Sequence, residues 1–206
     1  MSTPSPRPTL RERQAAATRL EIVAAARRLF AEHGFADTSI AQIAEEAGVA
    51  VQTVYKSMGS KRALLMALID AIDVEADVPA LRRQLHTADD AAALLHGLVE
   101  LTRAFPERSG DIIRALESAA PADPDAAAAL AEGERRHRGG AAEVAKRLDE
   151  LGALREGVTP EDAGVLISVL TARQSYLELV NGQGWTFDEA ARWVEETLAR
   201  TLLVAQ

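Results

Sequence analysis

The segment from Ser39 to Lys61 constrains the fold of this chain more than any other part of the sequence. Ser39, with Gln42 three residues later, has the pattern of a capping box and predicts the start of a helix. Gly48 predicts the end of that helix, because glycine readily adopts the left-handed conformation that often follows a helix. A second short helix is predicted over residues 50–57, and Ser60 is expected to cap a third. Two short helices joined by a tight turn that contains glycine form a helix-turn-helix pattern.

The second of these predicted helices has a polar outward face. Val54 and Met58 have the spacing of residues that turn toward a core, which leaves on the other side Val51, Gln52, Thr53, Tyr55 and Lys56. In protein–DNA complexes glutamine reads adenine, apolar groups contact the thymine methyl, and threonine, tyrosine and lysine contact phosphates. Lys61 begins the next helix, where backbone N–H groups also favour an anion. The spacing by itself fits DNA binding and an ordinary helix pair of a helical bundle equally well.

A larger set of positions resembles the DNA-binding domain of the TetR family of transcriptional regulators. The resemblance runs from about Leu20 to Leu68 and rests on Ile22, Ala25, Leu29, Phe30, Gly34, Phe35, Thr38, Ile40, Ile43, Ala44, Ala47, Gly48, Val49, Thr53, Val54, Tyr55, Ser60, Lys61 and Leu64. The chain departs from the family pattern at Met58, where phenylalanine is usual, and at Ser57, where a longer phosphate-contacting side chain is usual. The resemblance implies a DNA-binding site made of Thr38, Val51, Gln52, Thr53, Tyr55, Lys56, Ser57 and Lys61.

The charges of the chain are segregated in a way that fits this interpretation. The net charge is −8 over 206 residues, which by itself argues against a nucleic-acid partner. Residues 1–62, however, hold nine Lys/Arg and six Asp/Glu, whereas the remainder holds fourteen Lys/Arg and twenty-five Asp/Glu. An acidic body is repelled by phosphates, so DNA should approach the basic N-terminal part.

Helical periodicity extends over the rest of the chain, and no run of alternating β-branched residues predicts a strand, so we expect an all-α fold. Helices are predicted over about 18–33, from Ser60 to about 76 with Pro79 ending it, from Thr87 to a stop at Pro106, over 109–119, from Asp123 to about 151, from Thr159 to about 181, and from Thr186 onward. Residues 1–15 are expected to be a disordered, Pro-rich basic arm whose Arg7, Arg11 and Arg13 either reach DNA or only solubilise the chain. Residues 16–62 would then form the helix-turn-helix domain, and residues 63–206 a helical domain for ligand binding and dimerisation.

The predicted body contains many alanines and leucines with scattered polar residues, which is typical of an apolar pocket for a small-molecule effector. Candidate ligand-binding residues are His96, Arg103, Arg114, Glu117, Arg173 and Tyr176, each of which also fits an ordinary core or rim position. The last two helices resemble the TetR-family pair that forms a four-helix bundle with a second subunit. We therefore expect a homodimer, with Trp193 on the free surface and with charges at Leu170 and Leu198 disrupting it.

Other classes of protein find no support in the sequence. The chain has no cysteine, no Gly-rich phosphate loop, no GxSxG, and no histidine pattern for metal, so neither an enzyme nor a cofactor or metal site is expected. The first residues contain no apolar core of the kind that a signal peptide needs, no apolar segment reaches the length of a membrane span, and a cytoplasmic location is expected. The sequence thus predicts a ligand-responsive transcriptional repressor that binds a palindromic double-stranded DNA operator as a homodimer. The alternative is a helical small-molecule sensor or carrier without DNA binding.

Overall fold

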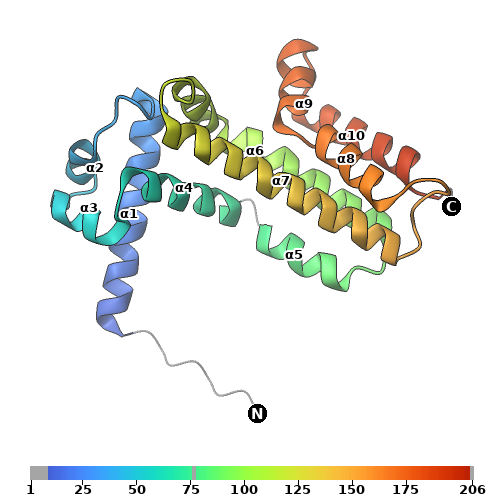
Figure 1. The fold of residues 1–206 in the computed structure, drawn as a ribbon, viewed down its shortest axis with the longest axis horizontal. Coiled ribbons are helices and arrows are strands. Elements are labelled where there is room, and N and C mark those ends of the chain that lie inside the picture. Colours follow the sequence, from blue (N-terminus) through green and yellow to red (C-terminus); the bar gives the residue numbers. More distant parts are fainter. Residues whose placement is uncertain (1–8, 76–77, 205–206) are drawn as a thin grey trace. The chain divides into compact units, whose positions relative to one another are not determined.

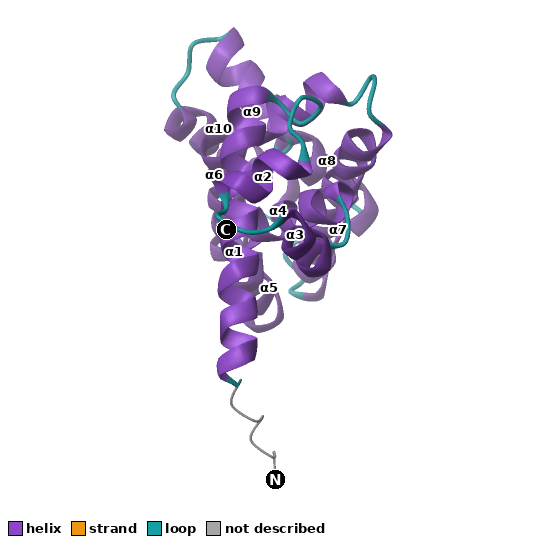
Figure 2. Ribbon diagram, turned by 90° about the vertical axis from the view of Figure 1, so that its left-hand side faces the viewer, coloured by secondary structure: helices purple, strands orange, loops and turns teal. Residues whose placement is uncertain are grey.

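The structure is a computed structural model that describes residues 9–75 and 78–204. Within these ranges it is built from helices and contains no strand, only an isolated bridge between Leu154 and Leu203, which confirms the all-α prediction (Figures 1 and 2). The helices are α1 Leu10–His33, α2 Ile40–Glu46, α3 Val51–Met58, α4 Lys61–Glu75, α5 Val78–Thr87, α6 Ala91–Ala119, α7 Pro124–Glu150, α8 Pro160–Leu170, α9 Arg173–Leu177, the π-helix η1 Glu178–Gly182 and α10 Phe187–Leu202.

The chain divides into two compact units, each with its own core. Unit 1 comprises Met1–Ile69 and Ile112–Ala129, and unit 2 comprises Asp70–Asp111 and Leu130–Gln206. These bounds differ from the expected domain boundary at residues 62 and 63, because unit 1 takes in most of α4 and the segment that joins α6 to α7. The buried residues of unit 1 come from α1 to α4, from the loop between α1 and α2, and from the end of α6 and the start of α7, among them Ile22, Phe30, Phe35, Ile43, Val54, Leu64, Leu68, Ile112 and Ala126. The core of unit 2 surrounds Val99, Val144, Leu148, Ile167, Tyr176, Val194 and Leu198.

The prediction of a disordered arm over residues 1–15 was wrong from residue 9 onward, since α1 begins at Leu10. Thr9 and Glu12 form a capping box in which the Thr9 backbone N–H donates to Glu12 Oε2 at 2.7 Å and the Glu12 N–H donates to Thr9 Oγ1 at 3.3 Å. Arg11 and Arg13 therefore lie on a helix, whereas Arg7 lies outside the described residues.

Two prolines that were expected to end helices do not do so. Pro79 is the second residue of α5, where a missing N–H has little effect because the first N–H groups of a helix have no partner within it. Pro106 lies inside α6, which runs without interruption from Ala91 to Ala119. An interior proline costs a helix about 3 kcal/mol, and the complete burial of Val99 and Ile112 on either side provides packing that offsets it.

Helix capping accounts for most of the remaining boundaries. Asp123 Oδ1 accepts from the Asp125 N–H at 2.9 Å, Thr159 caps α8, and Thr186 forms a capping box with Glu189 at the start of α10, all as predicted. Thr87 does not cap α6, because its hydroxyl donates back to Arg83 O within α5, and Asp90 fills that role. The long helix predicted from Thr159 to about 181 instead breaks after α8 into α9 and η1.

Candidate nucleic-acid interface

The α2–turn–α3 segment has the local geometry that the sequence predicts. Ser39 Oγ accepts from the Gln42 N–H at 3.2 Å, and Gln42 Oε1 accepts from the Ser39 N–H at 2.8 Å, which begins α2. Gly48 has a φ of +65°, a conformation that other residues rarely adopt, and the Val49 N–H then donates to Ala44 O at 2.9 Å. These contacts form a tight turn between the end of α2 at Glu46 and the start of α3 at Val51, and α3 packs against α2.

Two buried side chains of α3 set the face that it presents to solvent. Val54 and Met58 are 1% and 5% exposed, so they hold one side of the helix in the core of unit 1. Tyr55 and Val51 are 52% and 41% exposed, which is unusual for large side chains with apolar surface. Gln52 and Lys56 are also exposed, and Thr53 and Ser57 are half-buried. The outward face therefore combines an amide, a phenol, an ammonium group and an apolar side chain, which are types of group that contact bases and phosphates in protein–DNA complexes.

Two of the predicted DNA-binding side chains are turned into unit 1 instead. Thr38 is 2% exposed, and its hydroxyl donates to Gly34 O at 2.8 Å, so this side chain braces the loop before α2. Lys61 Nζ donates to Phe35 O at 2.5 Å and lies 4.1 Å from the centre of the Phe35 ring. Burial lowers the pKa of Lys61, and the carboxylates of Asp123, Asp125 and Asp37 partly oppose this effect. The spacing of the sequence could not reveal these contacts, because both depend on how the Phe35 loop folds back.

Two arginines of α1 that the sequence analysis did not select hold the helix-turn-helix in place. Arg19 Nη1 donates to Ser57 O at 2.8 Å, at the C-terminal end of α3. Arg28 Nη2 lies 2.8 Å from Glu46 Oε1, at the end of α2. Both contacts join residues far apart in the sequence, so no short motif could indicate them.

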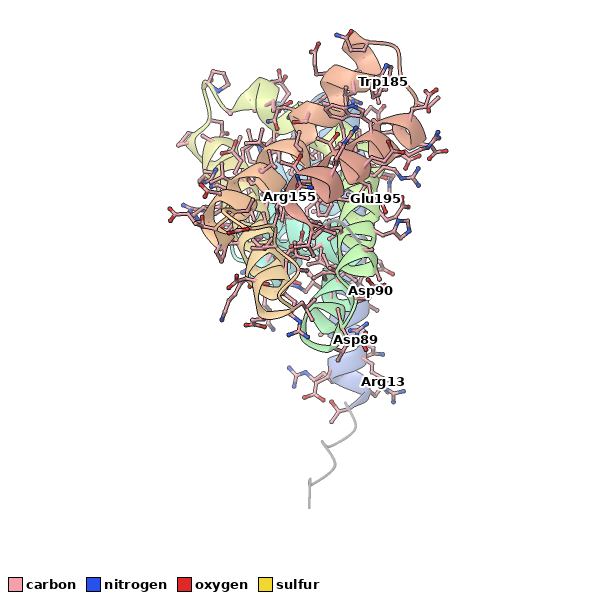
Figure 3. The ribbon with its side chains drawn as sticks, turned by 90° about the vertical axis from the view of Figure 1, so that its right-hand side faces the viewer. Arg13, Asp89, Asp90, Arg155, Trp185 and Glu195 are labelled. Atoms are coloured by element: carbon pink, nitrogen blue, oxygen red, sulfur yellow. The ribbon has the colours of Figure 1, made fainter. Side chains whose placement is uncertain are left out.

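The six residues proposed to bind a ligand are divided between the two units. Arg114 and Glu117 belong to unit 1, and the other four belong to unit 2. Within unit 2, His96 Nδ1 lies 3.0 Å from Oε2 of Glu195, which Figure 3 labels. Arg103 forms ion pairs with Glu100 and Asp188. Arg173 is half-buried on α9. These contacts give His96 and Arg103 structural roles between α6 and its neighbours.

Tyr176 is the one member of this set that lies wholly inside the core of unit 2. Its hydroxyl donates to Val99 O at 3.4 Å and lies 3.3 Å from Thr102 Oγ1. Burial raises the pKa of Tyr176 to about 12, and the hydrogen bond between Tyr176 and Thr102 partly opposes this effect, so the phenol stays protonated at neutral pH.

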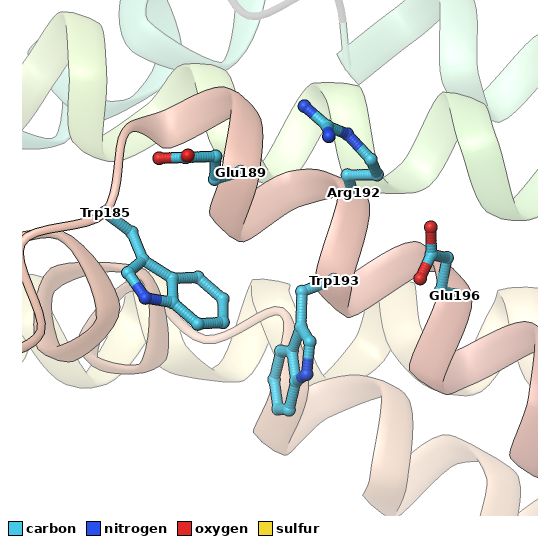
Figure 4. Close-up of a pocket in the computed structure, with 5 residues that line it drawn as sticks. All are labelled: Trp185, Glu189, Arg192, Trp193 and Glu196. Atoms are coloured by element: carbon cyan, nitrogen blue, oxygen red, sulfur yellow. The ribbon is translucent and has the colours of Figure 1, made fainter.

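Two open hollows occur in unit 2, and none of the six residues lines either. One, of about 580 Å³, is lined by Asp70, Asp73, Val78, Pro79, Glu132 and Arg136. Across it, Arg136 Nη1 lies 2.8 Å from Asp70 Oδ1 and 2.7 Å from Asp73 Oδ2, which joins α4 to α7. The other, of about 300 Å³, is lined by Trp185, Glu189, Arg192, Trp193 and Glu196, with the two indole rings edge to face at 6.0 Å (Figure 4).

The exposed face of α3 lies within a segment that matches a known sequence family. Residues 22–68 match the family model of bacterial regulatory proteins, tetR family. This chain is therefore similar to the tetR family over the segment that contains α2 and α3. No curated protein sequence matches it significantly. The matched segment covers nearly the same residues as the resemblance seen in the sequence, which runs from about Leu20 to Leu68.

Solved structures of TetR-family regulators share the fold over nearly the whole chain. NalD, the secondary repressor of the MexAB-OprM multidrug efflux pump in Pseudomonas aeruginosa, is 21% identical with a TM-score of 0.70, over 93% of this chain and 100% of that one. SmeT, the repressor of the Stenotrophomonas maltophilia pump SmeDEF, in its triclosan complex is 20% identical with a TM-score of 0.72, over 91% and 92%. A Saccharomonospora viridis regulator in complex with choline is 21% identical with a TM-score of 0.69, over 92% and 100%.

Two further findings concern membrane spans and metal sites. Among residues 9–75 and 78–204, no helix is long and apolar enough to cross a membrane. In the same ranges no group of three or more histidine, aspartate or glutamate side chains is arranged to hold a metal ion.

Proposed function

We propose that this protein is a transcriptional regulator that reads an operator through the outward face of α3. The observation that carries the proposal is the exposure of Val51, Gln52, Tyr55 and Lys56 on a helix that Val54 and Met58 anchor, inside the segment that matches the tetR family. Gln52 would read a base edge, Val51 would contact a thymine methyl, and Tyr55 and Lys56 would bind phosphates. A protein with this role acts where the DNA is, in the cytoplasm.

The regulator acts as a homodimer in this proposal. Val165 and Val169 lie one turn apart on α8 and are 61% and 58% exposed, and Trp193 on α10 is 39% exposed. Large apolar side chains gathered on neighbouring helices are typical of a surface that a partner covers. A second copy would cover it with the same residues about a two-fold axis. The operator would then be palindromic, with half-sites one helical turn or a multiple apart.

A small-molecule effector would control the affinity for DNA, and the protein would be a repressor. NalD and SmeT are repressors of multidrug efflux pumps, and structures in this group hold triclosan or choline. In this chain α4 follows α3 directly, and Arg136 of α7 binds its last turns through Asp70 and Asp73. An effector that displaces α7 would therefore act on α4, provided that it binds the two positions of α4 with different affinity.

Selection of binding sites from a random DNA library tests the proposal. The protein should enrich a palindrome, and titration of that duplex should give tighter binding than a scrambled duplex at the same salt concentration. Triclosan and choline are the first effector probes, added to the preformed complex. If no duplex is enriched while a small molecule binds, the protein is a sensor or carrier without DNA binding.

A further inference from the structure

The first turns of α1 extend beyond the packed part of unit 1. All buried residues of α1 come from its second half, namely Ile22, Val23, Ala25, Ala26 and Phe30. Residues 10–17 and 19–21 are exposed, and only Thr18 between them is half-buried. At 1.5 Å per residue, residues 10–21 correspond to about 18 Å of helix. Figures 1 and 2 show this part of α1 extending past α2 and α3.

Residues 10–21, the free turns of α1, form regular helix up to the first residue of α1, although none of them is buried in unit 1. Helix formation is costly only at the nucleus, and here the packed second half of α1 supplies the nucleus. Ala15, Ala16 and Ala17 are strong helix formers, and the capping box of Thr9 and Glu12 satisfies the first N–H groups. Hydrogen bonds from Thr9 lower the pKa of Glu12, so its carboxylate remains charged and engaged in the cap.

One side of the free turns carries a stripe of two arginines. Arg11, Ala15 and Arg19 are spaced four residues apart and therefore form one inclined row on the surface of α1, with Arg11 and Arg19 about 80° apart around the axis. At Arg19 this row points toward the C-terminal end of α3, because Arg19 Nη1 donates to Ser57 O. Arg11 lies eight residues before Arg19, which is about 12 Å further along the axis. We call Arg11, Ala15 and Arg19 the arginine stripe.

A third arginine on the same turns faces another way. Arg13 lies six residues before Arg19, which places it about 120° from Arg19 and about 160° from Arg11 around the helix axis. It is exposed on the free part of α1, where Figure 3 labels it. Arg11 and Arg13 thus have the same charge, similar exposure and neighbouring positions, and differ in the face that they occupy.

We infer that the arginine stripe is a second DNA-contacting element, which binds the phosphate backbone beside the groove that α3 enters. This inference rests on the proposed function. The stripe continues the proposed interface, since Arg19 contacts the end of α3 directly. Its charge complements a phosphate backbone, and guanidinium groups bind phosphate oxygens with two parallel hydrogen bonds. The small side chain of Ala15 lies between the two arginines, so it does not prevent a DNA backbone from approaching both.

The test compares Arg11→Ala with Arg13→Ala in the full chain. Circular dichroism first establishes that both variants keep the helical content of the unmodified protein. Each is then titrated on the duplex enriched from a random library and on a scrambled duplex, at four or more salt concentrations. A lost phosphate contact reduces the slope of log K against log salt by about 1, so a dimer that loses two contacts should show a reduction of about 2.

The expected result is weaker binding to both duplexes and a smaller salt slope for Arg11→Ala, with Arg13→Ala close to the unmodified protein. Equal effects of the two substitutions would overturn the inference, because they would reflect the non-specific attraction between positive charge and DNA and not a phosphate contact of one face of α1. Unchanged binding by Arg11→Ala would also overturn it, while the proposed function would stand. If the unmodified protein enriches no duplex, the proposed function itself fails, and this outcome precedes any comparison of variants.

Discussion

A charge placed at Val169 should separate assembly from folding. The Val169 side chain is 58% exposed on α8, so in an isolated subunit Val169→Asp replaces one solvated surface residue by another. Such changes usually alter the free energy of unfolding by no more than about 0.5 kcal/mol. In the proposed homodimer the same carboxylate would be buried against a second subunit without a partner, which costs about 2–5 kcal/mol per copy. Two copies cost at least about 4 kcal/mol, or roughly a thousandfold in the dissociation constant.

Sedimentation velocity at micromolar concentration measures the outcome. The unmodified protein should sediment as a dimer, and Val169→Asp as a folded monomer with unchanged helical content and greatly weakened operator binding. Val74→Asp is the matched control, since Val74 is 67% exposed on α4 and lies outside α8 and α10. The reasoning is refuted if the unmodified protein is a monomer, or if Val169→Asp still forms a dimer. Leu198, which the sequence analysis chose for the same test, is 0% exposed, so a charge there would unfold the subunit instead.

Three further predictions concern single side chains. Gln52→Ala should relax base preference at one or two operator positions, at a cost of about 1–3 kcal/mol in binding free energy. Tyr55→Phe should instead weaken binding to the selected and the scrambled duplex alike. If Gln52→Ala leaves the ratio of the two affinities unchanged, Gln52 reads no base. Thr38→Val should lower the free energy of unfolding by about 1 kcal/mol, because the hydrogen bond to Gly34 O is lost. Operator affinity, measured below the unfolding transition, should stay the same. A loss of operator affinity in the folded variant would show that Thr38 contacts DNA. The hydrogen bond and charge of Glu195 raise the pKa of His96 above 6.5, so this pair stabilises the fold below the unfolded pKa and loses that contribution as pH rises through the folded value. In an NMR titration Glu195→Gln should return the pKa of His96 toward 6.5, with only a small effect on stability because the pair is exposed.

The local features of the helix-turn-helix were determined by the sequence alone. Ser39 with Gln42, Gly48, and the pair Val54 and Met58 act over a few residues, so their capping, turn and burial could be predicted without knowledge of the rest of the chain. The caps at Thr159 and Thr186 were predictable for the same reason, because a hydroxyl needs only the N–H groups two or three residues ahead. Such short-range hydrogen bonds depend little on tertiary context.

Tertiary packing decided what local patterns leave open. Pro106 is a helix breaker by propensity, yet α6 continues through it because buried residues on both sides hold the helix. Lys61 has the sequence position of a phosphate-binding lysine, but the Phe35 loop provides a carbonyl and a ring that bind its ammonium group. The burial of Leu198 and the exposure of Val169 likewise depend on which faces of α8 and α10 meet inside one subunit. These outcomes are set by contacts between residues far apart in the chain, which the pattern of one sequence does not contain.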